Sequence, residues 1–308
     1  MWYRGTADAI YQNIYLLDQE RPRYVLILSG DHVYSMDYRQ MIAQHEETGA
    51  DLTIGCIEVP REEAKRFGVM EVDASLRIRS FAEKPADPKP IPGKPDRSLA
   101  SMGIYVFTTE TLVRSLIADA RRADSQHDFG KNVIPALVEG NARVYAHPFH
   151  EPGRPENNYW RDIGTLESYY AANMDLLEPE PPFRLDDPDW PVRTYYLPAP
   201  PARVVSEGQE AVVENSMLSP GAVVRGATVR RSILGPNVVL EPGAVVEDSL
   251  IFEGTRVGKG AQVRRTIIDK QVVVPPGDRI GGQPRDRSRG FKITESGLVV
   301  IPKGMVLA

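Results

Sequence analysis

The sequence contains very little cysteine and no long apolar segment. Cys56 is the only cysteine among 308 residues, so no disulfide can form within the chain. This cysteine usage fits a reducing compartment, and we expect a cytoplasmic protein. No apolar run approaches the roughly 18 residues of a membrane-spanning helix, and no basic and then apolar start indicates a secretory signal. A membrane is therefore not an expected partner.

The sequence also lacks a large excess of charge of either sign. Charged residues make up 26% of the chain and hydrophobic residues 42%, as in ordinary globular proteins, and the net charge is -5 at pH 7. An acidic balance disfavours non-specific binding to phosphate backbones, so nucleic acid is not an expected partner.

Apolar strands alternate with helical segments over the first half of the chain. The run at 24–28 is hydrophobic on both faces, ends in Ser29-Gly30 and then presents Asp31, which indicates a central parallel strand rather than a helix. The alternation predicts an α/β domain with a mostly parallel sheet. Further strands are expected at 52–59, 101–107 and 143–149, a hairpin at 69–81, and helices at 7–17, 37–48, 109–120 and 165–177.

Beyond a proline-rich segment the sequence repeats. Residues 179–201 contain eight prolines, which indicates a semi-rigid linker. After it, apolar residues recur every five or six positions, with a small residue two positions before most of them. This hexapeptide pattern predicts a parallel β-helix in which each short strand turns one apolar side chain inward. The repeating residues are Val224, Val229, Leu234, Leu240, Val246, Ile251, Val257, Val263 and Ile268.

Asp31 and Asp162 are the candidate metal ligands. Asp31 follows a strand at its carboxyl end, where α/β sheets bind ligands, and Asp162 lies in a turn before a helix. Mg²⁺ takes one or two carboxylates together with phosphate oxygens. If the two acids meet, they form a metal site for phosphate chemistry; otherwise Asp31 is an acid that caps its own turn.

Several basic residues have both a functional and a structural interpretation. Lys84, between Glu83 and Pro85, is either a solvated lysine or a point charge for a sugar phosphate, with Glu83 accepting from sugar hydroxyls. The arginine pairs at 230–231 and 264–265 are either solvated or an anion pocket for a phosphorylated regulator. His127, His147 and His150 are not spaced as metal ligands and are expected to be structural or at the surface.

Eight motifs, in order along the chain, resemble those of bacterial glucose-1-phosphate adenylyltransferase, also called ADP-glucose pyrophosphorylase. The motif SGDHVY alone would indicate only the wider group of sugar nucleotidyltransferases, but several of the others are specific to the ADP-glucose branch. They are WYRGTADA at 2–9, SGDHVY at 29–34, FGVM at 67–70, FAEKP at 81–85, ASMGIY at 100–105, HDFGK at 127–131, YWRDIGT at 159–165 and WPVRTY at 190–195.

The resemblance implies an enzyme that transfers the adenylyl group of ATP to glucose 1-phosphate, giving ADP-glucose and pyrophosphate for glycogen synthesis. It implies Mg²⁺ on Asp31 and Asp162, with Lys84 as a further catalytic residue. It also implies a Rossmann-like nucleotidyltransferase domain, a left-handed β-helix, a homotetramer and a phosphorylated allosteric effector. The residues implied at glucose 1-phosphate are Tyr3, Gly68, Glu83, Lys84, Ser101, Asp128, Phe129 and Trp160, and those implied near ATP are Trp2, Gly5 and Thr6.

One element of that family is missing from the sequence. Its members begin with a strand and a glycine-rich loop whose backbone N–H groups hold the triphosphate. No such loop precedes Trp2, and Gly281-Gly282 lies beyond the repeats. We therefore expect an N-terminally truncated catalytic domain at 1–178, a linker at 179–210 and the β-helix at 211–308. We also expect weak activity of these residues alone and an uncovered edge beside the strand that ends at Asp31.

Three alternatives remain open at this point. The chain can be a non-catalytic regulatory subunit, although Asp31, Lys84 and Asp162 are all present. It can use another nucleotide and sugar, such as GTP with mannose 1-phosphate. It can be an acyltransferase built on a hexapeptide β-helix, although residues 151–308 contain no histidine to act as its base.

Overall fold

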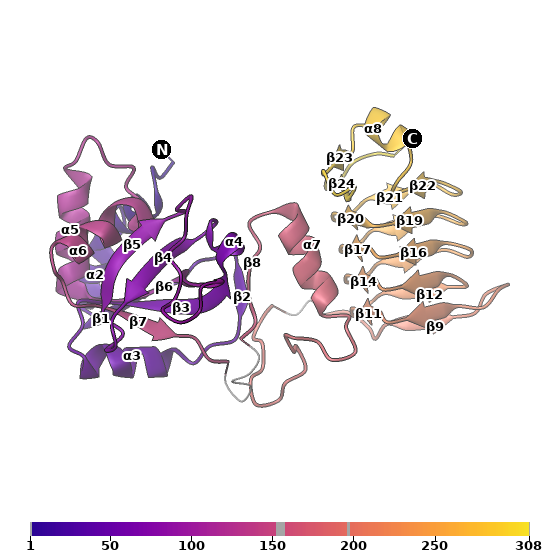
Figure 1. The fold of residues 1–308 in the computed structure, drawn as a ribbon. Coiled ribbons are helices and arrows are strands. Elements are labelled where there is room, and N and C mark those ends of the chain that lie inside the picture. The colour runs from indigo at the N-terminus through magenta and orange to yellow at the C-terminus, as the bar shows by residue number, and fades with distance from the viewer. Residues whose placement is uncertain (1, 152–157, 196–197, 308) are drawn as a thin grey trace. The chain divides into compact units, whose positions relative to one another are not determined.

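The computed structural model describes residues 2–151, 158–195 and 198–307 (Figure 1). The chain forms two compact units, which we describe one at a time. The first contains Met1–Gly30 and Met36–Asn158, and the second contains Asp31–Ser35 and Tyr159–Ala308. No helix of the described residues is long and apolar enough to cross a membrane. These two units are defined by contacts within the folded chain. The domain limits expected from the sequence, at residues 178 and 210, remain a prediction.

A six-stranded sheet forms the centre of the first unit. Its strands lie in the order β5-β4-β6-β3-β7, and β1 pairs with the far end of the long strand β6. The strands are β1 (Tyr24–Ile27), β3 (Leu52–Pro60), β4 (Gly68–Val72), β5 (Ile78–Glu83), β6 (Arg97–Thr108) and β7 (Val144–Pro148).

The expectation of a mostly parallel sheet is wrong for the described strands. Only β3 and β7 pair in parallel, while the pairs β1–β6, β3–β6, β4–β5 and β4–β6 are antiparallel. Periodicity indicates which residues are buried but not the direction of the neighbouring strand, because a strand buried on both faces reads alike in either pairing.

Strand β1 is also not the central parallel strand that its apolar run predicts. It pairs antiparallel with β6, Tyr24 opposite Thr108, and its four residues are only partly buried. Leu28, just beyond it, is 44% exposed. Within the described chain β6 is its only strand partner.

Helices cover the sheet and follow local sequence signals. Asp37 caps α3 by accepting from the N–H of Arg39 at 3.0 Å, as acidic caps do. The helix expected at 7–17 is two helices, separated near Asn13, whose side-chain amide donates to the carbonyl of Ala9 at 2.8 Å. The helices of this unit are α1 (Thr6–Tyr11), α2 (Ile14–Glu20), α3 (Tyr38–Glu47), α4 (Arg61–Ala64), α5 (Thr109–Ala120), the π-helical turn η1 (Phe129–Val133) and α6 (Ile134–Glu139).

The second unit contains the expected β-helix and a two-stranded ribbon. Three sheets, two of five strands and one of six, are built from successive coils, and their strands pair in parallel except that β23 pairs antiparallel with β24. The ribbon pairs β2 (His32–Tyr34) with β8 (Trp160–Asp162), and helix α7 (Leu166–Asp175) follows it. The other elements are β9 (Arg203–Val205), β10 (Val212–Glu214), β11 (Met217–Leu218), β12 (Val223–Arg225), β13 (Thr228–Arg230), β14 (Ile233–Leu234), β15 (Val239–Leu240), β16 (Val245–Glu247), β17 (Leu250–Ile251), β18 (Arg256–Val257), β19 (Gln262–Arg264), β20 (Thr266–Ile268), β21 (Val273–Val274), β22 (Arg279–Ile280), α8 (Arg285–Ser288), β23 (Lys292–Ile293) and β24 (Val299–Ile301).

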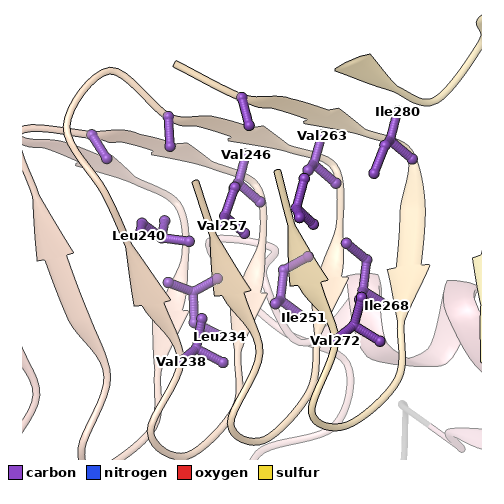
Figure 2. Packing of buried hydrophobic residues seen from close by; sticks show 14 of the residues in the cluster. Leu234, Val238, Leu240, Val246, Ile251, Val257, Val263, Ile268, Val272 and Ile280 are labelled. Carbon is purple, nitrogen blue, oxygen red and sulfur yellow. The ribbon is translucent and has the colours of Figure 1, made fainter. Parts of the chain in front are cut away.

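The repeating apolar residues fill the inside of the coils, as predicted. Figure 2 shows Leu234, Leu240, Val246 and Ile251 pointing into one continuous interior. All nine predicted positions are at most 1% exposed. Each side chain stacks on the equivalent residue of the next coil, so coil-on-coil contact supplies the core.

A row of left-handed residues turns the chain at one corner of four successive coils. Asn215, Arg231, Asp248 and Arg265 have φ values of 44°, 43°, 45° and 45°. Each precedes a serine or threonine whose hydroxyl donates to the carbonyl two residues earlier at 2.7 Å. The serine and threonine hydroxyls of the repeat therefore donate hydrogen bonds to backbone carbonyls at these corners, where the strand pairing is interrupted.

Candidate active site

The ribbon of the second unit brings Asp31 and Asp162 together. In the antiparallel register His32 lies opposite Asp162. The N–H of Ile163 donates to the carbonyl of Asp31 at 3.0 Å, which holds the two segments side by side. The sequence-based interpretation of 159–165 as a turn is therefore incomplete, because three of these residues form β8.

Gly164 marks the point at which the two carboxylates converge. A Cβ atom on Gly164 would lie 3.0 Å from Oδ1 of Asp162 and 3.7 Å from Oδ2 of Asp31. The N–H of Gly164 also donates to Oδ1 of Asp162 at 2.8 Å. Since hard divalent cations take one or two carboxylates and leave other positions to phosphate and water, this donor set fits such a cation. Within the described part of the chain, no cluster of three or more His, Cys, Asp or Glu ligands occurs.

Trp160 and His32 lie on the same ribbon as the acids. Their ring centroids are 5.1 Å apart with an interplanar angle of 83°, an edge-to-face contact. Nε2 of His32 is 3.7 Å from Oδ1 of Asp31. Trp160, predicted at the sugar, therefore belongs to the second unit together with both predicted metal ligands.

Other predicted residues come together in the first unit, around Asp128 at the start of η1. One carboxylate oxygen of Asp128 accepts from the N–H of Lys131 at 3.0 Å, and the other accepts from the hydroxyl of Thr6 at 3.1 Å. The Thr6 oxygen in turn accepts from the N–H of Phe129 at 3.0 Å. These bonds join the start of α1 to the HDFGK motif, and π-helical turns of this kind are frequent at functional sites.

Two glycines give Glu83 its place beside Asp128. A Cβ on Gly130 would meet Oε2 of Glu83 and lie 2.9 Å from its Cδ. A Cβ on Gly68 would lie 3.0 Å from the same carboxylate and would also strike the ring of Phe81. The Glu83 carboxylate can therefore occupy this place only if residues 68 and 130 have no side chain. The sequence had indicated Gly68 as a site residue but not Gly130.

The environment of Glu83 disfavours its charge. Burial raises the pKa of Glu83 above its usual value, and the negative charge of Asp128 adds to this shift. The positive charges of Lys84 and Lys131 act in the opposite direction. Lys84 is 62% exposed, with Nζ 4.0 Å from Oε1 of Glu83. Perturbed carboxylates beside an accessible cation are typical of binding sites.

Ser101 and Phe129 are buried near this cluster. Ser101 is 7% exposed and Phe129 is 2% exposed. Burial raises the pKa of Tyr105 to about 12, and a hydrogen bond with Ser101 opposes the shift. The rings of Tyr105 and Phe129 are 5.7 Å apart, so Phe129 anchors η1 to the core.

The residues predicted near ATP differ in their surroundings. Trp2 is 94% exposed, and Tyr3, predicted at the sugar, is 54% exposed. Gly5 packs on the backbone of residues 126–127, where a Cβ would lie 2.8 Å from the carbonyl carbon of His127. The structure thus gives Gly5 a packing reason of its own, and its contact with ATP remains a prediction.

Sequence reasoning missed the support of the HDFGK motif. His127 and Asp119 are both buried, and their side chains approach to 2.8 Å between Nδ1 and Oδ2. Ser125 donates from its hydroxyl to the other Asp119 oxygen at 2.6 Å and accepts from the N–H of His127 at 2.9 Å. His127 is therefore structural, as expected, but its acidic partner carries no sequence signal.

The arginine pairs of the β-helix mainly contact acids. Arg230 pairs with Glu214 at 2.8 Å, Arg231 with Asp248 at 3.1 Å and Arg264 with Glu247 at 3.0 Å. Arg265 lies 5.9 Å from the centroid of the Tyr170 ring. These contacts favour the structural interpretation of the pairs over an anion pocket.

Comparisons with known proteins match two families along the chain. Residues 2–179 match the family described as nucleotidyl transferase, and residues 200–301 match the family described as GlmU-like, C-terminal hexapeptide. The repeat family agrees with the predicted left-handed β-helix.

The chain is similar over its full length to curated bacterial proteins. It is 48% identical over 313 residues to glucose-1-phosphate adenylyltransferase of Rhodopirellula baltica, covering 100% of this chain and 70% of that protein. It is 46% identical over 307 residues to glucose-1-phosphate adenylyltransferase 2 of Alkalilimnicola ehrlichii, covering 99% and 72%. The Shewanella sp. ANA-3 protein of the same name is 45% identical over 309 residues, with 99% and 73% covered.

Proposed function

Because this chain belongs to the glucose-1-phosphate adenylyltransferase family, we propose that it transfers the adenylyl group of ATP to glucose 1-phosphate. A phosphate oxygen of glucose 1-phosphate attacks the α-phosphorus of ATP, the bond from that phosphorus to the β-phosphate oxygen breaks, and pyrophosphate leaves. ADP-glucose for glycogen synthesis is the product. The observation that carries the proposal is the convergence of Asp31 and Asp162 on Gly164.

Each group of residues has its own part in this proposal. Asp31 and Asp162 would hold Mg²⁺, which screens the phosphates and stabilises the leaving pyrophosphate when it is bound. Lys84 supplies an exposed positive charge for the phosphate of glucose 1-phosphate. Glu83 and Asp128 accept hydrogen bonds from sugar hydroxyls, in a place that Gly68 and Gly130 keep open.

The remaining predicted contacts belong to the same proposal. Ser101 and Phe129 complete the sugar site of the first unit with Tyr3, while Trp2, Gly5 and Thr6 lie near ATP. Trp160 lies on the ribbon of the second unit, beside the two acids. Cytoplasmic location is proposed because ATP is abundant there and the buried Cys56 is a free thiol. A homotetramer and a phosphorylated effector are proposed from family membership alone.

The test combines equilibrium binding with product formation. We expect the 308-residue chain to bind glucose 1-phosphate by calorimetry, and we expect Lys84→Ala to weaken that affinity at least 10-fold. ADP-glucose is then measured at high protein concentration with ATP and Mg²⁺, so that slow turnover is detected. Asp31→Asn and Asp162→Asn are expected to abolish the product without changing glucose 1-phosphate binding.

The controls decide between this function and its alternatives. GTP with mannose 1-phosphate tests another nucleotide and sugar, and a higher yield from that pair would overturn the assignment of substrates. A chain that binds no glucose 1-phosphate would contradict the proposal and favour a regulatory subunit.

A further inference from the structure

The far end of α7 contacts the ribbon that carries the two acids. The carboxylate of Asp175 accepts from the Tyr159 hydroxyl at 2.8 Å and lies 3.1 Å from the Arg161 guanidinium. Successive side chains of an extended chain point to opposite faces. Arg161 of β8 and Tyr159, which directly precedes the strand, therefore lie on one face, while Trp160 and Asp162 share the other. Asp175 therefore holds the ribbon from the face opposite to Asp162.

The side chains that make these contacts are buried or half-buried. Tyr159 is 8% exposed, and the Asp175 side chain is 22% exposed. Burial, followed by the hydrogen bond to Asp175, raises the pKa of Tyr159, so its hydroxyl remains a donor. The Arg161 guanidinium also lies 5.7 Å from the centroid of the Tyr159 ring, which closes a three-residue cluster around one carboxylate.

The first turn of α7 fixes the same ribbon from its other end. Thr165 caps the helix in a capping box with Ser168, whose N–H donates to the Thr165 hydroxyl at 3.1 Å. Only Ile163 and Gly164 separate this cap from Asp162. The helix therefore contacts the ribbon at both of its ends, through the chain at Thr165 and through the side chain of Asp175.

Helix α7 is in turn fixed to the outside of the β-helix. Met174 is buried against Leu250 and Ile267, which point outward from successive coils of one sheet. The hydroxyl of Tyr170 donates to the carbonyl of Asp248 at 2.7 Å. The ribbon is therefore braced against a stack of coils, all within the second unit.

We propose that Asp175 is a positioning residue for Asp31 and Asp162: it fixes the ribbon β2–β8 on α7 and so holds the two carboxylates in the arrangement that binds the divalent cation. This inference rests on the proposed function of the two acids. It makes the β-helix a structural support of the metal site in addition to any role in assembly. Partners in the outer shell of metal sites commonly change metal affinity by 10–100-fold when they are lost.

The test measures binding of Mn²⁺, as the probe cation, by loss of the free Mn²⁺ EPR signal. We expect Asp175→Ala to weaken Mn²⁺ affinity about 10-fold, because the ribbon loses its brace. Affinity for glucose 1-phosphate is expected to change less than about twofold, since that site is built on the first unit. Tyr159→Phe removes one of the two donors and is expected to have a smaller effect in the same direction.

Matched controls separate positioning from general destabilisation. Glu178→Gln removes a carboxylate just beyond the same helix that pairs with Arg231, 3.6 Å away, and does not contact the ribbon. It is expected to leave Mn²⁺ affinity unchanged. If Asp175→Ala does not fold, Tyr159→Phe decides: wild-type Mn²⁺ affinity in that variant would overturn the inference.

The remaining outcomes distinguish the inference from the proposed function. If Asp31→Asn binds Mn²⁺ as the wild type does, the proposed metal site itself is wrong. If Asp31→Asn loses the cation but Asp175→Ala retains it, only the positioning role fails. Equal losses of Mn²⁺ and glucose 1-phosphate affinity in Asp175→Ala would indicate a merely structural role and would also overturn it.

Discussion

Nδ1 of His127 lies 2.8 Å from Oδ2 of Asp119, and each of these two side chains is only 8% exposed. The pair closes the loop between α5 and η1, with Ser125 bonded to both residues. His127 adopts a left-handed φ of 54°, and its carbonyl accepts from the N–H groups of Ala7 and Asp8. The buried pair thus sets the backbone that leads into Asp128.

Removing the Asp119 carboxylate should therefore affect both stability and sugar binding. We expect Asp119→Ala to lower the free energy of unfolding by about 2–3 kcal/mol, because two hydrogen bonds to a charged acceptor are lost. We also expect weaker binding of glucose 1-phosphate, since Asp128 follows directly. Asp124→Ala, which removes an exposed carboxylate that pairs with Arg122, is the control and should change neither quantity. Urea unfolding and calorimetry measure the two effects.

Gly130→Ala should impair the sugar site while the chain still folds. The added methyl group would displace the Glu83 carboxylate, so we expect affinity for glucose 1-phosphate to fall about 10-fold, the loss of one charge-assisted hydrogen bond. Gly277→Ala is the control, since it adds strain at a φ of 72° with open space around it, far along the sequence in the β-helix. That variant should lose stability only. Unchanged affinity in Gly130→Ala would show that Glu83 does not bind the sugar.

Glu83→Gln should stabilise the protein at neutral pH. Burial raises the pKa of Glu83 above its usual 4.5, so the folded state binds its proton more tightly than the unfolded state does. The contribution of the protonated Glu83 to the free energy of unfolding is fully present below about pH 4.5. It is lost as the pH rises through the pKa of the folded state. The variant should therefore unfold at a higher urea midpoint at pH 7 and lose this advantage near pH 4. It should also bind glucose 1-phosphate more weakly, because an acceptor is lost.

His45 should make stability fall on mild acidification. It is 1% exposed and bonds to the hydroxyls of Thr53 and Thr108 at 2.8 and 3.1 Å. Burial lowers the pKa of His45 from its usual 6.5 to about 4, so the unfolded state takes up a proton first as pH falls. Stability should therefore decrease between about pH 6.5 and 4, by up to about 3 kcal/mol from this residue.

The variant His45→Gln isolates this contribution. Its unfolding free energy should depend less steeply on pH in that window, whatever its absolute stability. His147, whose pKa burial also lowers to about 4, keeps part of the slope in both proteins. Equal slopes for the variant and the wild type, measured by urea unfolding from pH 4 to 7, would contradict the assignment.

Some features of this protein were readable from local sequence alone. The inward positions of the β-helix follow a repeat of five or six residues, and each coil stacks on an equivalent one, so the pattern fixes the contact. The helix caps at Asp37 and Thr165 act within three residues and were predictable for the same reason. The motifs also predicted the family, which the similarity to curated proteins confirms.

The candidate site was only partly predictable. The motifs named Asp31, Asp162, Glu83 and Asp128 as candidates, but no sequence pattern brings residue 31 beside residue 162. The steric reason for Gly130 is the Glu83 carboxylate, which comes from a distant segment and is not visible in the sequence. At Gly164 the close carboxylate is that of Asp162, and the Asp31 carboxylate comes near it only in the folded chain. Asp175 and Asp119 carry no motif, since the groups that they hold are reached only in the folded chain.

The sequence by itself determined the β-helix interior, most of the helices and the set of candidate acids, because each depends on neighbours along the chain or on an exact repeat. Tertiary structure alone decided that the sheet of the first unit is mostly antiparallel. It also decided that three of the four arginines at 230–231 and 264–265 pair with acids. It also decided that the ribbon β2–β8, held by Asp175, brings Asp31 and Asp162 together. These features depend on which distant segments pack together. The periodicity of buried residues in the sequence is the same whichever segments pack, so it cannot predict them.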